Sequence, residues 1–332
     1  MDSLVKPVSN SDLQPRLANL RVHHLDDALD DDLALIRKGL SDAKPWLHPK
    51  FFYDSRGSRL FDAITETPEY YPTRTETSIF SRYTHEIMDQ MSDRAVLVEP
   101  GSGNCVKALK LLSDERLNHY APIEISRSFL VDCCTRLAAN NPALLVDAVC
   151  GDFTRCQSLP RSVPADGRVV FFPGSTIGNF DPDHAQTLLE NFHELADGGY
   201  LLIGADLPKD RATLERAYND SQGITAQFNL NMLSHLSSCH ECKFTPEHFE
   251  HLAFYNAELK RIEMHLVCKT GTAIQVQNDI FTLTPGQSIH TESSYKYDSA
   301  DLLRMARSAG FEPVGQWTDS RDWFAVYLLR AA

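Results

Sequence analysis

The chain of 332 residues lacks any apolar run near the roughly 20 residues that a membrane-spanning helix needs. Its first residues also lack the apolar core of a secretory signal, so none is expected. Lys and Arg number 32 against 45 Asp and Glu, which gives a net charge of −13. Because binding to nucleic acid or anionic membranes requires an excess of cations, neither is expected as a main partner. These absences favour a cytoplasmic protein.

A matched set of cysteines is missing as well. The eight cysteines are scattered through the chain, and they do not form the dense pattern of a small disulfide scaffold. One C-x-x-C motif joins Cys239 and Cys242, but no second pair follows at the spacing of a structural zinc site. We therefore expect reduced thiols and no metal.

The most informative stretch is Val-Leu-Val-Glu-Pro-Gly-Ser-Gly-Asn at residues 96–104. The three apolar residues predict the end of a buried strand, and a helical pattern follows over 106–112. A strand, a Gly-rich turn and a helix favour a nucleotide-like ligand, because Gly101 and Gly103 let the backbone approach it. The dinucleotide fingerprint has a third glycine where this chain has Val106, which disfavours a nicotinamide cofactor. The acid-x-Gly-x-Gly form resembles motif I of class I S-adenosylmethionine (SAM) methyltransferases.

Strands and helices alternate from residue 96 to residue 204, which predicts a parallel sheet with right-handed crossovers. After residue 207 the pattern changes to a long helical region and then to segments typical of antiparallel strands. A helix at 299–309 and two terminal strands follow, as in class I methyltransferases. The predicted fold is therefore α/β, a class I SAM-methyltransferase Rossmann-like sheet with an inserted second α+β domain.

This organisation predicts four segments along the chain. Residues 75–206 form the SAM-binding methyltransferase domain, and residues 299–332 complete its sheet. Residues 207–298 are the inserted part of a substrate domain, and residues 1–74 are its N-terminal part.

Acidic residues follow successive predicted strands, where an open α/β sheet binds its ligand. Glu124 comes 21 positions after Gly103, at the place where a carboxylate can accept ribose hydroxyls. Asp152 and Phe153 come after the third strand and offer an acceptor for an adenine amino group beside an apolar ring. Each acid alone could be a solvated or helix-capping residue. Together with Glu99 after the first strand, they favour SAM as the cofactor.

Asn179 follows the fourth strand, near the point where a substrate would meet the methyl group. Its amide offers a donor and an acceptor without charge. A free amine needs positioning and loss of a proton, and not a protein nucleophile. The alternative for Gly178-Asn179 is a simple turn.

Residues 44–77 concentrate Tyr, Pro and Arg, and Pro68 and Pro72 predict a break between helices. Loops on a rigid scaffold often carry binding residues. We interpret this stretch as a lid or pocket wall. The alternative is a structural loop whose tyrosines pack as hydrophobic caps.

Five further stretches carry a closer resemblance. They are FYDSRGSRLFDAITETPEYYPTRTE, GSTIGNF, AYNDSQGITAQFN, RIEMHL and HTESSYKY. They resemble the EgtD-like family of histidine Nα-methyltransferases in ergothioneine biosynthesis, and the likeness runs from about residue 45 to 329. That family transfers three methyl groups from SAM to the α-amino group of histidine and produces hercynine. The resemblance implies this activity, with SAM as co-substrate, L-histidine as the small-molecule partner, and a monomeric enzyme.

The resemblance also implies the site residues, by motif match. The amine and carboxylate of the substrate would be held by Asn179 and Tyr218, with Tyr53 near the reacting amine. The imidazole would be held by Tyr70, Glu292 and Ser294, and Met264 would line the same pocket. The matches for the cofactor are Gly101, Lys107, Glu124, Asp152 and Phe153. Glu124 stands where the family has Asp, so the carboxylate is kept and a methylene is added.

Glu292 and Ser294 are two positions apart, so on an extended strand they face the same side. A carboxylate gives an imidazole a charge-assisted hydrogen bond. Relatives acting on other aromatic amino acids would not need it, so Glu292 favours histidine; a solvated acid at the rim is the alternative. Two other functions stay open: an N-methyltransferase of this family acting on another amino acid or an alkaloid precursor, and a catalytically silent SAM-binding sensor or scaffold.

Overall fold

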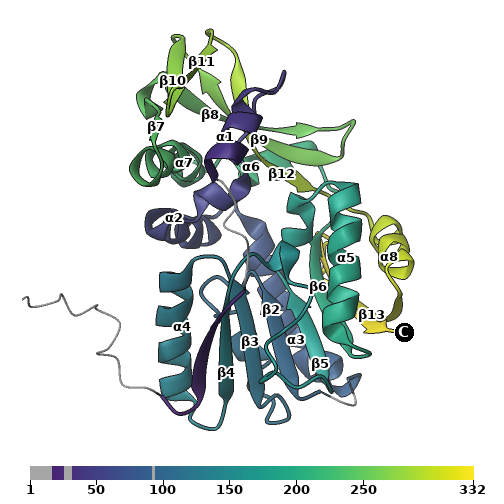
Figure 1. Ribbon diagram of the computed structural model, residues 1–332. Coiled ribbons are helices and arrows are strands. Elements are labelled where there is room, and N and C mark those ends of the chain that lie inside the picture. Colours follow the sequence, from purple (N-terminus) through teal and green to yellow (C-terminus); the bar gives the residue numbers. More distant parts are fainter. Residues whose placement is uncertain (1–16, 26–31, 92–93) are drawn as a thin grey trace, which may run out of the picture.

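The computed structural model describes residues 17–25, 32–91 and 94–332. An eight-stranded sheet in the order β1-β4-β3-β2-β5-β6-β14-β13 fills the lower part of Figure 1. Its strands are β1 Leu20–His24, β2 Val96–Pro100, β3 His119–Glu124, β4 Leu145–Cys150, β5 Arg168–Phe172, β6 Tyr200–Asp206, β13 Phe311–Thr318 and β14 Phe324–Ala331. The first six pair in parallel, while β14 runs antiparallel to β6 and β13 antiparallel to β14. The predicted class I methyltransferase sheet is confirmed.

Helices cover both faces of this sheet, which explains the continuous apolar runs of its strands. Val96, Leu97 and Val98 in β2 are fully buried. One face packs against α3 (Tyr71–Asp89) and α4 (Arg127–Asn140), and the other against α5 (Pro182–Ala196) and α8 (Ser299–Ser308). Within the described ranges, no helix combines the length and apolarity needed to cross a membrane.

The upper part of Figure 1 holds two small sheets and the remaining helices. One sheet has the order β12-β9-β8 and the other β11-β10-β7. Their elements are α1 Asp32–Leu40, α2 Ser55–Thr65, α6 Arg211–Ala217, α7 Ile224–Cys239, β7 Cys242–Lys243, β8 Phe249–Asn256, β9 Arg261–Cys268, β10 Thr272–Val276, β11 Asp279–Leu283 and β12 Ser288–Tyr295. One hydrophobic core joins Phe52 from the N-terminal part to Phe228, Met232 and Leu266. This shared core supports the predicted substrate domain, whose bounds stay a proposal.

The structure corrects the N-terminal segment of that prediction. Residues 1–74 were predicted to belong wholly to the substrate domain, but β1 pairs in parallel with β4 at the edge of the large sheet. Leu20 lies opposite Val146, and His24 opposite Cys150. Residues 1–16 and 26–31 of the segment lie outside the described ranges.

One local prediction is also wrong. The predicted helix at 106–112 is a set of turns with one short 3₁₀ helix, η2 (Ala108–Lys110), after left-handed backbone at Gly103 and Cys105. The break between helices predicted from Pro68 and Pro72 is present at residues 66–70, and Pro72 lies in the first turn of α3, where a proline loses no intrahelical hydrogen bond.

Candidate active site

The predicted substrate residues come from distant parts of the chain and meet between the carboxyl ends of the large sheet and the β12-β9-β8 sheet. Their positions are Tyr53 after η1 (Pro49–Phe52), Tyr70 before α3, Asn179 at the end of η4 (Thr176–Asn179), Tyr218 after α6, Met264 in β9, and Glu292 and Ser294 in β12. Direct contacts join most of them, so the structure brings this predicted set together.

Glu292 is held from the side of the large sheet. Asn179 Nδ2 donates to Glu292 Oε1 at 3.1 Å. Met264 is the cross-strand neighbour of Glu292, and both are buried. Burial raises the pKa of Glu292 to about 7, against the lowering effect of Lys296. The carboxyl group is therefore poised to exchange a proton near neutral pH, and it is not the solvated rim acid that was the alternative.

Ser294 receives two hydrogen bonds. Tyr218 donates its hydroxyl to Ser294 Oγ at 2.8 Å, and Lys296 Nζ donates to the same oxygen at 2.7 Å. A hydroxyl oxygen has two lone pairs, and an ammonium group can only donate. Both acceptor positions of Ser294 are filled, so its own hydrogen is left to donate to another group.

Lys296 is a site residue that the sequence did not reveal. It is 1% exposed and pairs with Asp206 at 2.9 Å. Asp206 also contacts Lys209 at 2.6 Å and accepts the Tyr71 hydroxyl at 2.7 Å. Although burial opposes it, the two ammonium groups hold the pKa of Asp206 below its usual range. Asp206 ends β6, so the strand-end rule applied to Glu124 could have found it; a lone lysine in HTESSYKY gave no signal.

Tyr53, Tyr70 and Tyr218 supply neutral polar groups among aromatic rings. The rings of Tyr70 and Tyr218 pack edge to face, with their centroids 6.2 Å apart, and the ring centroids of Tyr53 and Phe228 lie 6.0 Å apart. Burial, followed by the charge of Glu292 and neighbouring tyrosines, raises the pKa of Tyr53 well above its usual range. Burial likewise raises the pKa of Tyr70 and of Tyr218. All three hydroxyls stay protonated at neutral pH.

On the predicted cofactor side, the Gly-rich turn requires its glycines. Gly101 has φ +68° and Gly103 has φ +51°, both in the left-handed region. The Phe153 ring lies over Gly101, where an added Cβ would come within 3.2 Å of a ring carbon. The Gly101 amide donates to the Ile123 carbonyl at 2.8 Å. The turn is thus fixed against β3, with an aromatic ring beside it.

Glu124 lies at this turn. Its carboxylate accepts the Gly103 amide at 3.1 Å and the Ser126 amide at 3.2 Å. Burial raises its pKa, while the backbone hydrogen bonds lower it. The structure thus brings Gly101, Gly103, Glu124 and Phe153 together.

The two other predicted cofactor residues have structural partners. Lys107 Nζ pairs with Glu76 at 2.7 Å, and Glu76 accepts the Gly174 amide at 2.6 Å, which links α3 to the end of β5. Asp152 Oδ1 accepts the amide of Thr154 at 2.9 Å and caps η3 (Phe153–Arg155). The capping role considered from the sequence is therefore present, and a contact of Asp152 with adenine stays a prediction.

Glu99 has a structural partner too. Tyr120 donates its hydroxyl to Glu99 Oε2, and both side chains are buried. Burial raises the pKa of Glu99 well above its usual range. Glu99, the acid that precedes the Gly-rich turn, is therefore anchored to β3 by a hydrogen bond.

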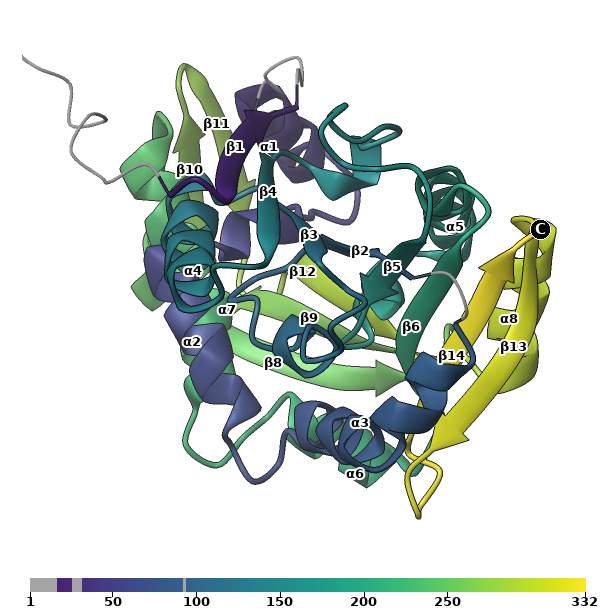
Figure 2. The same ribbon diagram turned by 90° about the horizontal axis from the view of Figure 1, so that it is seen from below.

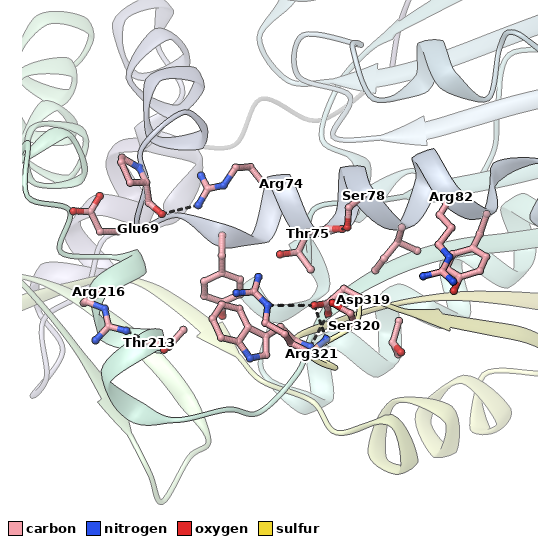
Figure 3. Close-up of a pocket in the computed structure, with 16 residues that line it drawn as sticks. Glu69, Arg74, Thr75, Ser78, Arg82, Thr213, Arg216, Asp319, Ser320 and Arg321 are labelled. Atoms are coloured by element: carbon pink, nitrogen blue, oxygen red, sulfur yellow. Dashed lines mark hydrogen bonds and ion pairs between the residues drawn. The ribbon is translucent and has the colours of Figure 1, made fainter.

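A cleft of about 700 Å³ lies on the outer side of α3. Figure 2 shows α3 beside α6 and the β13–β14 hairpin, which supply the walls. In Figure 3, Arg74, Thr75, Ser78 and Arg82 follow α3, and Asp319–Arg321 face them from the hairpin. The described residues that line it include none of the predicted site residues.

Two arginines of this cleft are engaged with other groups of the protein. Arg74 donates to the carbonyls of Thr67 and Pro68, each at 2.6 Å. The Arg321 guanidinium lies 3.6 Å from the centre of the Trp323 ring. None of the predicted substrate or cofactor residues lines this cleft, so we do not place the reaction here, although a large concave pocket is the usual first choice.

Comparison with known proteins identifies the family of the chain. A family described as "Histidine-specific methyltransferase, SAM-dependent" matches residues 30–331. The chain is 37% identical over 300 residues to the histidine N-alpha-methyltransferase of Mycolicibacterium smegmatis, covering 88% of this chain and 92% of the relative. It is 36% identical over 302 residues to that of Mycobacterium tuberculosis, with the same coverage.

A more distant relative is ergothioneine biosynthesis protein 1 of Neurospora crassa. It is 28% identical over 310 residues, which cover 83% of this chain and 32% of that longer protein. The family match spans residues 30–331, which include every segment that contributes to the cluster, and each mycobacterial relative covers 88% of the chain. The chain therefore belongs to the SAM-dependent histidine-specific methyltransferase family.

Proposed function

We propose that the protein transfers three methyl groups in succession from SAM to the α-amino group of L-histidine, and that the product, hercynine, leads toward ergothioneine. The observation that carries this proposal is that β12 carries, two positions apart, the buried Glu292 carboxylate and a Ser294 hydroxyl whose two acceptor positions are filled. Family membership supplies the reaction type, and this pair supplies the substrate.

A neutral imidazole has one N–H donor and one nitrogen acceptor. The Glu292 carboxylate can accept the N–H, while the Ser294 hydrogen can donate to the other nitrogen. The phenol of tyrosine and the indole of tryptophan have no ring nitrogen that accepts in this way. An indole would leave the Ser294 hydrogen without an acceptor, which costs about 1–3 kcal/mol. A phenol carries its donor and its acceptor on a single oxygen, whereas an imidazole offers them on two separate ring atoms.

The reaction needs a free amine. In each transfer the nitrogen lone pair bonds to the methyl carbon as the carbon–sulfur bond of SAM breaks, and S-adenosylhomocysteine leaves. One proton must leave the nitrogen before each attack, because an ammonium group has no lone pair. An adjacent carboxylate would stabilise the ammonium form. Tyr53 and Tyr218 are neutral, so they can orient the nitrogen without holding its proton.

SAM itself fits the Gly-rich turn. The open backbone at Gly101 and Gly103 allows close approach, and Glu124 offers acceptors for ribose hydroxyls. The Phe153 ring offers an apolar face to adenine. We assign these contacts, with Lys107 and Asp152, to the cofactor, and we propose that no metal takes part in the methyl transfer.

A substrate panel tests the proposal. The purified protein is incubated with SAM and, separately, with histidine, tryptophan or tyrosine, and S-adenosylhomocysteine release is followed. We expect release with histidine and little with the other two. Release with another amino acid and not with histidine would favour the broader N-methyltransferase. SAM binding by calorimetry without release for any amino acid would favour the silent sensor.

We also propose that the enzyme acts as a monomer in the cytoplasm. The net charge of −13 supports a protein that stays apart from nucleic acid and anionic membranes. Light scattering coupled to size-exclusion chromatography tests the monomer, and a dimeric mass would contradict it.

A further inference from the structure

The β12-β9-β8 sheet carries a second polar cluster, formed by Glu263, His265 and His290. The carboxylate and the two imidazoles place one ligand-type atom each within 4.8 Å of one another. Within the described ranges this is the one group of three His, Cys, Asp or Glu side chains with that spacing. Cys239 and Cys242 do not belong to it.

The strand register puts this cluster on the sheet face away from the substrate residues. His265 and His290 are cross-strand partners, and Glu263 is two positions before His265 on β9. Met264 and Glu292 are also cross-strand partners, and Met264 lies between Glu263 and His265 on β9, so this pair faces the opposite side of the sheet. The His265 side chain is 15% exposed and that of Glu263 is 9% exposed, so solvent ions can reach them.

We propose that Glu263, His265 and His290 bind a divalent transition-metal ion of the zinc type, with solvent as the fourth ligand. The site is separate from the methyl-transfer chemistry.

The distances suit such an ion. Bonds of about 2.1 Å in a tetrahedral site separate neighbouring ligand atoms by about 3.4 Å. His265 Nε2 and Glu263 Oε2 are already 3.0 Å apart. The ligand atom of His290 lies within 4.8 Å of the other two, so this ring must approach them when the ion binds.

Neighbouring groups can orient these ligands. His265 Nδ1 lies 3.2 Å from Ser288 Oγ, and a hydroxyl can accept a hydrogen bond from an imidazole N–H as well as donate one. The ring proton can therefore sit on Nδ1 and leave the Nε2 lone pair for the metal. Arg261 Nη2 and Asn256 Nδ2 bind the other oxygen of Glu263, at 2.7 and 3.0 Å. Outer partners of this kind fix ligand orientation in metal sites.

The same neighbours predict selectivity. Mg²⁺ and Ca²⁺ need several oxygen ligands, whereas this site has one carboxylate, partly neutralised by Arg261. Imidazole ligands suit Zn²⁺, Ni²⁺ and Cu²⁺. We therefore expect Zn²⁺ to bind and Mg²⁺ not to.

The test is competition for Zn²⁺ between the protein and a chromogenic chelator, in a Cys239→Ser background without a histidine tag. Cys239 is an exposed thiol that could bind zinc on its own. We expect one Zn²⁺ per chain, and a loss of affinity of more than about tenfold in His265→Ala and in His290→Ala. His85→Ala is the matched control, because His85 pairs with Asp89 on an exposed helix surface. Among the described residues, this pair belongs to no group of three possible metal ligands.

Thermal unfolding with and without Zn²⁺ shows that each variant is folded and gives a second readout. Zn²⁺ should raise the melting temperature of the background protein and of His85→Ala, and not that of the two cluster variants. Equal zinc affinity in all four proteins, or no zinc bound by the background protein, would overturn the proposal. An equal response to Mg²⁺ would overturn the selectivity.

Discussion

Replacing Glu292 with Gln should stabilise the protein and weaken its substrate binding at the same time. Gln keeps the size and the carbonyl acceptor that Asn179 Nδ2 contacts, and it removes the buried charge. The pKa of Glu292 is about 7 in the folded protein, against an ordinary value of 4.5. Each pKa unit corresponds to about 1.4 kcal/mol, so the buried carboxylate costs the fold about 3 kcal/mol well above pH 7.

The sign of the pH dependence follows from the raised pKa. As the pH rises above 4.5, the unfolded chain releases this proton first, so the free energy of unfolding falls until the pH passes about 7. Glu292→Gln removes that loss. Its free energy of unfolding should exceed the wild-type value by about 1–3 kcal/mol at pH 8, and by less than about 1 kcal/mol at pH 5.

Urea unfolding at pH 5 and pH 8 measures this difference. Calorimetric titration with histidine, in the presence of S-adenosylhomocysteine, measures binding. A neutral hydrogen bond replaces a charge-assisted one, so we expect affinity to fall by about tenfold. Glu250→Gln, at an exposed position in β8, should change neither quantity. Identical stability of wild type and Glu292→Gln at both pH values would refute the burial argument, and unchanged histidine affinity would refute the substrate assignment.

Three more substitutions separate the roles of the site residues. Lys296→Met should raise the KM for histidine by about tenfold and leave SAM affinity unchanged, because Ser294 loses one donor; steady-state kinetics with both substrates varied would contradict this if KM stayed constant. Gly101→Ala combines a φ of +68° with a clash against Phe153, so SAM affinity measured by calorimetry should fall by about tenfold or more; unchanged affinity would argue that SAM does not use this turn. Tyr53→Phe keeps the aromatic packing and should lower kcat by about 10–100-fold if its hydroxyl orients the amine; an unaltered single-turnover rate would remove it from the reaction.

The sequence predicted the large sheet well, because its strands are buried on both faces and read as short apolar runs. The alternation of strands and helices predicted from residue 96 to residue 204 is present in the structure. The strand-end rule also led to Glu124 and Asn179. These features depend on local pattern and on one general property of parallel sheets.

Pairings between distant segments were beyond local pattern. Lys296 and Asp206 lie 90 positions apart in the chain, and their contact depends on how β12 packs against the end of β6. β1 joins the large sheet through pairing with β4, whereas residues 1–74 were predicted as part of the substrate domain. The presence of two prolines did not show that α3 begins at Tyr71, because that depends on where Pro72 lies within the first turn of the helix.

The central claim is tested most directly by tandem mass spectrometry of histidine after incubation with the protein and SAM. We predict histidine carrying one, two and finally three methyl groups, with fragments that place all of them on the α-nitrogen. Methylation on the imidazole ring, or histidine recovered unmethylated from protein that binds SAM, would contradict the account.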